Sequence, residues 1–153
     1  MAHSLKSISK ALGLSQNRVE QWISRGHFCP PERVPYSRSN DWEAVDALRL
    51  ALMIRLVEGG ISPRDAGVMS QLRPPLHRTE KTFFVAWQGR HSTAFKNEDG
   101  SYVKMYTPGR WYDELVLISD LLKFVQDPDV FQSLVIDLDG LWERVQSALV
   151  AEH

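Results

Sequence analysis

Polar side chains that can form paired hydrogen bonds gather in one short stretch near the start of the chain. Gln16, Asn17 and Gln21 carry amides, each of which offers a donor beside an acceptor, and Arg18 adds a guanidinium group. In the major groove of B-DNA an amide matches the edge of adenine, and a guanidinium matches the two acceptors of guanine. These residues therefore have the chemistry to read base pairs if they share the exposed face of a helix. Arg25 is expected on the same outward side.

Two short predicted helices on either side of a glycine position this stretch. Leu5, Ile8 and Leu12 have the spacing of one helical face, so we expect the first helix from about Ser4 to Leu12. Gly13 ends it, because glycine takes a left-handed cap without steric cost.

The second helix is expected to begin after a three-residue turn. Ser15 can cap it with its hydroxyl, and Leu14 and Val19 occupy the two positions of a hydrophobic staple. Val19, Trp22 and Ile23 are predicted to be buried, which leaves the polar residues outward. The two elements predict a helix-turn-helix.

A loop stiffened by proline follows, from His27 to Ser39. It contains three prolines and no helical periodicity, which favours a rigid extended loop or a short hairpin. Arg33, Tyr36 and Arg38 place hydrogen-bond donors on this loop. A stiff loop loses little entropy when such donors bind an anionic backbone, so the loop is predicted to contact phosphates.

Two further helices complete the first half of the chain. Residues 40–43, Asn-Asp-Trp-Glu, have the form of a capping box, so a helix is expected to start at Asn40 and run to Gly59 and Gly60. Ser62 and Pro63 open a fourth helix, with a capping hydroxyl followed by proline at the first helical position. We expect the proline pair 74–75 to close a domain of residues 1–75. The apolar face of the third helix is predicted to hold Trp42, Val45, Leu48, Leu52 and Leu56.

Several short sequences stand in a fixed order between residues 5 and 70. They are residues 5–15 for the first helix and turn, 22–26 for the end of the second, Arg33 with residues 36–37, Asp41, and residues 58–62 with 65–67. In order and spacing they resemble the winged helix-turn-helix of the MerR family of bacterial transcription regulators. The resemblance implies that Asn17, Arg18 and Gln21 face bases. It also implies that Arg33, Tyr36 and Arg38 hold phosphates from the wing.

Two features depart from that family. Its typical members continue into a long helix that forms an antiparallel dimeric coiled coil, whereas two prolines and an aromatic strand follow here. Metal-sensing and redox-sensing relatives use several cysteines near that helix, but this chain contains only Cys29. One cysteine builds neither a thiolate metal cage nor an internal disulfide, so we expect no metal or cofactor and interpret Cys29 as a packing residue.

The distribution of charge separates the two halves of the chain. Residues 1–78 hold 11 Lys and Arg against 7 Asp and Glu, a net of +4, whereas residues 79–153 hold 7 against 12, a net of -5. This asymmetry predicts that residues 1–78 face a polyanion and that residues 79–153 do not touch DNA. The longest apolar clusters are too short to span a bilayer, and with 43% hydrophobic residues the 153-residue chain can fill a real core. We therefore expect no membrane contact, and the single cysteine fits a reducing cytoplasm.

The second half changes to aromatic and β-branched runs. Residues 83–87, 93–95 and 102–106 read as an antiparallel meander, and a helix is expected near residues 119–126. Residues 133–138 fit either a strand of this sheet or part of one long helix beginning at residues 127–129; Gly140 favours a strand followed by a closing helix over residues 140–151. The predicted class is a mostly α N-terminal domain followed by a small α+β domain over residues 80–153.

The C-terminal half offers fewer chemical signals. Asp127, Asp129, Asp137 and Asp139 include the paired carboxylates that a metal-dependent site needs, but Asp127 and Asp129 are better explained as a helix start. No enzymatic activity is predicted. The aromatic residues can line a ligand pocket or stack on bases, although at strand positions they more often form core. They are Phe83, Trp87, Phe95, Tyr102, Tyr106, Trp111 and Tyr112.

The sequence as a whole predicts a transcription regulator that binds double-stranded DNA and occupies or distorts a promoter. Two alternatives stay open: an excisionase-like architectural factor, and a protein-interaction module with a vestigial DNA-binding domain. The C-terminal domain is expected to form a homodimer or to respond to a ligand, since regulators gain affinity by pairing two modules over symmetric half-sites. The apolar residues expected to form the dimer contact are Leu115, Val116, Leu141, Trp142 and Val145.

Overall fold

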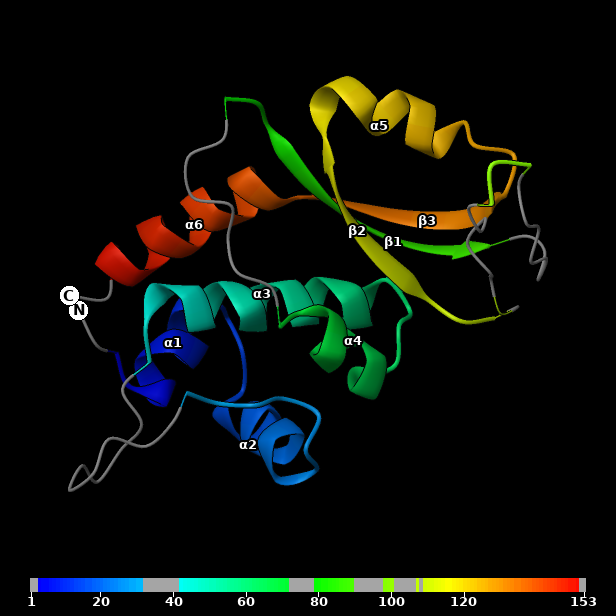
Figure 1. The fold of residues 1–153 in the computed structure, drawn as a ribbon. Coiled ribbons are helices and arrows are strands. Elements are labelled where there is room, and N and C mark those ends of the chain that lie inside the picture. Colours follow the sequence, from blue (N-terminus) through cyan, green and yellow to red (C-terminus); the bar gives the residue numbers. More distant parts are fainter. Residues whose placement is uncertain are drawn as a thin grey trace. The chain divides into compact units, whose positions relative to one another are not determined.

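The computed structural model describes residues 3–31, 42–71, 79–89, 98–100, 107 and 109–151 (Figure 1). They form two compact units. The helical unit comprises Met1–His77 together with Leu138–His153, and the sheet unit comprises Arg78–Asp137. Six helices and one three-stranded antiparallel sheet are described, which is an α+β composition.

The helical unit begins with two short helices, α1 (Leu5–Ala11) and α2 (Gln16–Ser24). The Ser4 hydroxyl caps α1 by accepting from the Ser7 amide at 3.1 Å. Gly13 has a φ of 67°, and its amide donates to the Lys10 carbonyl at 3.1 Å. The predicted first helix and its glycine stop are thereby confirmed.

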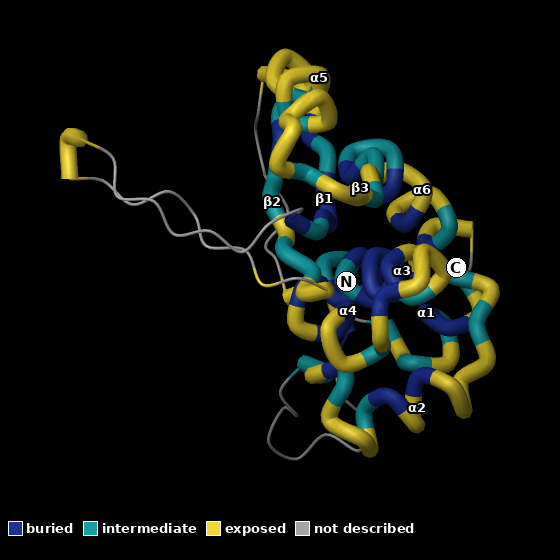
Figure 2. The backbone as a smooth tube through the Cα atoms, turned by 90° about the vertical axis from the view of Figure 1, so that its right-hand side faces the viewer, coloured by how far each residue is buried: buried dark blue, intermediate teal, exposed yellow. Residues whose placement is uncertain are grey.

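The helix α3 (Ala44–Glu58) forms the core of this unit. It packs against α4 (Pro63–Met69) and α6 (Leu138–Ala151), and it is buried along most of its length (Figure 2). The Ser62 hydroxyl caps α4 by accepting from the Asp65 amide at 3.2 Å, and Pro63 takes the first helical position, as predicted. The buried large side chains of α3 include Leu48, Leu50, Leu52, Met53 and Leu56.

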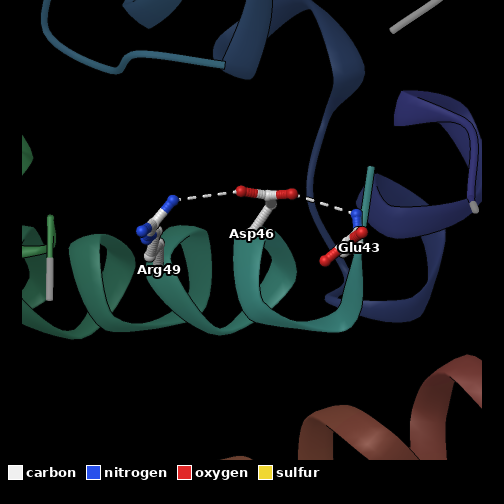
Figure 3. A network of polar contacts seen from close by, with 3 residues as sticks. All are labelled: Glu43, Asp46 and Arg49. Atoms are coloured by element: carbon white, nitrogen blue, oxygen red, sulfur yellow. Dashed lines mark hydrogen bonds and ion pairs between the residues drawn. The ribbon is translucent and has the colours of Figure 1, made fainter. Parts of the chain in front are cut away.

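The start of α3 differs from the expected capping box at residues 40–43. The helix begins at Ala44, and its cap joins Glu43 to Asp46, whose carboxylate accepts from the Glu43 amide at 3.0 Å (Figure 3). The same carboxylate bonds to the Arg49 guanidinium at 3.2 Å. Trp42 is not on the helix, because its backbone pairs with His3 in an isolated bridge. Asn40 lies outside the described residues.

The C-terminal helix α6 also departs from the expected boundary at residue 80. Its contacts are with α1 and α3, so Leu138–His153 belongs to the helical unit. Leu138, Leu141, Val145 and Leu149 are its buried residues. Their i, i+3, i+7 and i+11 spacing gives one apolar stripe, which the sequence assigned to the C-terminal domain only because it follows that domain in the chain.

The sheet unit consists of three antiparallel strands in the order β2-β1-β3 (Figure 1). These are β1 (Thr82–Gly89), β2 (Tyr112–Leu117) and β3 (Val130–Asp137). The helix α5 (Ile118–Val125) covers one face of the sheet. On that face Val85, Trp87 and Val116 form a buried cluster, against which Leu121 and Phe124 of α5 pack.

The predicted strand at residues 83–87 and helix near residues 119–126 are confirmed, and the segment at residues 133–138 is a strand and not part of one long helix. The strand β2 was missed, because Asp113 and Glu114 interrupt its apolar pattern. The predicted strands at residues 93–95 and 102–106 lie outside the described residues.

Candidate nucleic-acid interface

The helix α2 holds the polar residues singled out from the sequence. Val19 and Trp22 are buried against the rest of the helical unit, and Ile23 is half-buried, not fully buried as expected. The five predicted contact residues on or beside this helix are all exposed: Gln16, Asn17, Arg18, Gln21 and Arg25.

Helical geometry divides the exposed face into a centre and two flanks. At about 100° per residue, Asn17 and Gln21 point most directly away from the buried side. Arg18 and Arg25 follow along one flank, and Gln16 lies on the other. The two amides with base-reading chemistry therefore occupy the middle of the surface, with two cations beside them.

Arg18 is held in place by its own helix. Its guanidinium carbon lies 4.9 Å from the centre of the Trp22 ring, in cation–π geometry. Trp22 is buried at the base of α2, so the ring offers a fixed platform. Arg18 itself stays exposed, so its donors remain accessible from solvent. This arrangement reduces the entropy that Arg18 would lose on binding a ligand.

Glu20 is a member of this surface that the sequence analysis missed. The Gln16 amide nitrogen donates to the Glu20 carboxylate at 2.8 Å. The signal was available, because residues four apart on a helix are neighbours. The pair places a negative charge on the flank opposite Arg18 and Arg25, so the surface is polarised across the helix.

The N-terminal end of α2 lacks the expected side-chain cap. Ser15 occupies the capping position, but its hydroxyl accepts no hydrogen bond from the helix. Ser4 and Ser62, in the same position on α1 and α4, both accept one. Backbone amides at the start of a helix are suited to phosphate oxygens, and α2 presents such amides without a hydroxyl of its own across them.

Two stacked aromatic rings lie on either side of the segment that follows α2. Phe28 and Trp42 are both buried, with ring centres 5.9 Å apart and planes 4° from parallel. The Trp42 backbone also exchanges two hydrogen bonds with His3, at 2.7 and 3.1 Å. Both ends of the segment predicted to form the wing are thus anchored. Arg33, Tyr36 and Arg38 themselves lie outside the described residues.

The end of α2 is also fixed against α4. A Cβ atom added to Gly67 would lie 1.6 Å from the His27 carbonyl oxygen, so only glycine allows this close approach. The amides of His27 and Phe28 both donate to the Trp22 carbonyl, at 2.8 and 3.2 Å. Cys29, which we expected to be packed, is exposed, because Phe28 takes the buried position beside it.

The aromatic residues described in the sheet unit serve mainly as core. Trp87 packs on Phe124 edge to face and on Tyr112 in a stack, with ring centres 5.9 and 5.1 Å away. The Tyr112 hydroxyl accepts from the Thr107 amide at 2.8 Å, and hydrogen bonding with Thr107 lowers the pKa of Tyr112 from its ordinary value. Phe95, Tyr102 and Tyr106 lie outside the described residues.

The aspartates near β3 lie at opposite ends of the strand, with Asp127 and Asp129 before it and Asp137 at its end. Asp127 and Asp129 precede the strand, where the Asp129 amide donates to the Asp127 carboxylate at 2.9 Å. Asp137 ends the strand in an ion pair with Lys81, eight residues farther along. At about 3.3 Å per residue, that separation is too long for one metal ion to bridge. Across the described ranges, no three His, Cys, Asp or Glu side chains gather as a metal site would require.

Comparison with known proteins identifies no relative of this chain. No helix among the described residues has the length and apolar character needed to cross a membrane. No protein-family model matches the chain, and neither does any curated protein.

Proposed function

We propose that this protein binds double-stranded DNA in a sequence-specific manner through α2 and regulates transcription in the manner of a MerR-like regulator. The observation that carries the proposal is the exposed centre formed by Asn17 and Gln21, flanked by Arg18 on its Trp22 platform. Amides and a guanidinium at the N-terminal part of an exposed helix are the groups that read adenine and guanine edges in the major groove.

The geometry of α2 separates the groups that would contact bases from those that would contact the phosphate backbone. The amides and Arg18 would read bases, whereas Arg25 and the backbone amides at the start of α2 would bind phosphates. Phe28 and Trp42 hold the two ends of the wing segment, from which Arg33, Tyr36 and Arg38 would reach the backbone on either side. Promoter binding or distortion requires no catalysis, and the proposed contacts call for none.

The test is a titration of the full chain with a pool of random duplexes at several salt concentrations. Binding should weaken with salt, with log affinity falling by roughly 0.9 per phosphate neutralised for each unit of log salt. Sequencing of the bound duplexes gives the preferred site. Mapping bound sites in the genome then separates promoters, as proposed, from the recombination sites that an architectural factor would occupy.

Three variants assign the roles. Arg18→Ala should cost on the order of 1 to 3 kcal/mol and relax the preference at one base position, and Asn17→Ala should relax another. Arg144→Ala is the matched control, because Arg144 is an exposed arginine on α6, which packs on α1 and α3. Failure of the full chain to bind any duplex at low salt would contradict the proposal. Unchanged specificity in both α2 variants would contradict the assignment of base contacts.

A further inference from the structure

The sheet unit leaves a group of large apolar side chains exposed. We name as the α5–β3 patch the set Ile118, Leu122 and Val125 of α5 with Phe131 and Val135 of β3, which are 52%, 63%, 41%, 64% and 38% exposed. The helical unit, in its described residues, exposes only Val68 and Val150 in this way, and these lie on different helices. Single exposed apolar residues are normal on protein surfaces, whereas clusters mark contact sites.

The helical part of the patch lies on the flank of α5 that faces β3. Leu121 and Phe124 point into the core of the sheet unit. Asp120 and Lys123 line a hollow on the β2 side, together with Glu114. Helical geometry puts Ile118, Leu122 and Val125 on the opposite flank from Asp120 and Lys123.

The strand part of the patch adjoins this flank. Val135 pairs in register with Val85, so it shares the sheet face that α5 covers. Phe131 lies at a β-bulge, where the register shifts from Gln88–Gln132 to Gly89–Val130, and its side chain is exposed there. Val135 therefore adjoins the exposed flank of α5, and Phe131 is exposed at the end of β3 that follows α5 in the chain.

The strand β3 is also an edge strand of the sheet formed by the described residues. Among the described residues, no strand pairs with its outer side. The seven residues 130–136, Val-Phe-Gln-Ser-Leu-Val-Ile, contain no charge, whereas the other edge strand, β2, carries Asp113 and Glu114. Proteins normally guard sheet edges with charges or prolines, because an unguarded edge is a template for another strand. The edge beside the apolar patch lacks charge and proline over residues 130–136, and its one bulge lies at the start of the strand.

We propose that a second copy of this chain binds here, with the two β3 strands pairing antiparallel about a twofold axis. Two identical strand edges that run antiparallel can pair their backbone N–H groups with each other's C=O groups. No other protein is then needed to bind the backbone groups of this edge. The contact would join two three-stranded sheets into one of six strands. Each α5–β3 patch would then meet its twin across the seam.

Area and charge favour a second copy over another occupant. The patch exposes on the order of 500 Å² of apolar surface, and the strand edge and polar rim bring it close to the roughly 800 Å² per partner of a stable interface. The sheet unit, residues 78–137, holds 7 Lys and Arg against 9 Asp and Glu, a net charge of -2, and none of these charges lies within residues 130–136 of β3, so no charge on this edge opposes a second copy. The uncharged edge is the face along which two copies can approach.

The register follows from the same residues. If Ser133 lies on the twofold axis, position 131 of one copy is opposite position 135 of the other, so that Phe131, at the bulge, lies beside Val135. Aromatic residues opposite β-branched ones are favourable cross-strand pairs. The alternation of side chains places Gln132 on the other face.

Sedimentation of the full chain at tens of micromolar, without DNA, tests the proposal. The wild type should be a dimer, and Leu122→Lys and Val135→Lys should each weaken the association at least tenfold. Val150→Lys is the control, a valine of the helical unit that is exposed to 75%, and should remain dimeric. Because Leu122 lies on a helix and is mostly exposed, its variant should keep the wild-type circular dichroism even if the strand variant does not. A monomeric wild type would overturn the proposal, as would a dimer that survives Leu122→Lys.

Oxidative cross-linking tests the register. In a Cys29→Ser background, Ser133→Cys should form a disulfide dimer, because the two sulfurs would face each other at the axis. Ser119→Cys, on the polar side of α5, should not. Efficient cross-linking through residue 119 with none through residue 133 would place the contact on another face and overturn the proposed pairing. Neither experiment involves DNA, so each outcome is independent of the proposed function.

Discussion

The two units of this chain differ in what they leave exposed. The helical unit buries most of its described large apolar side chains and presents amides and guanidinium groups on α2, whereas the sheet unit presents the apolar α5–β3 patch and an uncharged strand edge. A polar surface with directed donors suits a charged, hydrogen-bonding partner, and an apolar one suits a partner that excludes water.

This difference predicts opposite responses to salt. Counterion release makes DNA binding weaken as salt rises, whereas screening of the repulsion between two acidic sheet units should leave their association unchanged or tighter. One chain can therefore regulate its two contacts separately. The residues that read DNA are not those that bring two copies together.

Removing α6 should have the largest effect on the stability of the helical unit and on DNA binding. A chain that ends at Asp137 loses four buried side chains, Leu138, Leu141, Val145 and Leu149, from the helical unit. Large-to-small changes at single sites of this kind cost about 2 to 5 kcal/mol each, and whole domains are stable by only about 5 to 15 kcal/mol. We expect the shortened chain to lose helical circular dichroism and DNA binding together. Unchanged thermal unfolding would mean that the helical unit folds without α6.

Gly67→Ala should have the next largest effect. The new methyl group would collide with the His27 carbonyl, which is backbone and cannot rotate away. The cost should be about 1 to 3 kcal/mol or more in the free energy of unfolding, measured by urea denaturation. Val68→Ala, at the exposed neighbour, should stay within about 0.5 kcal/mol. Equal effects at residues 67 and 68 would contradict the close contact between α4 and the end of α2.

The elements that local pattern specifies could be predicted, and those that depend on distant partners could not. The glycine stop at Gly13, the Ser62 cap and the exposure of Asn17 follow from neighbours within a few residues. The start of α3 required the pairing of Trp42 with His3, which the sequence around Trp42 does not reveal. The placement of α6 likewise depends on contacts with α1, more than a hundred residues away along the chain.

The residues expected at the dimer contact show the same limit. Leu141 and Val145 are buried in the helical unit, and Val116 lies in the core of the sheet unit, so none of these three is exposed to form a contact. Leu115 and Trp142 are half-buried. An apolar stripe on a helix looks the same in sequence whether it faces the core or a second copy. Only the fold shows that α5 has apolar residues on more than the flank it buries.

The smallest effect, and the sharpest comparison, concerns the three serines at the N-terminal capping positions of α1, α2 and α4. Ser4→Ala and Ser62→Ala each remove a hydroxyl that accepts from a helix amide, and each should destabilise the unit by about 1 kcal/mol. Ser15→Ala should cost only a few tenths, since its hydroxyl makes no such bond. Thermal unfolding of the three variants measures the difference. If the Ser15 hydroxyl has no capping role, its removal should also leave DNA affinity near that of the wild type, because the phosphate would be held by the backbone amides of α2. A cost at Ser15 equal to that at Ser62 would mean that the hydroxyl covers those amides in solution, and α2 would then have to bind DNA through its side chains alone.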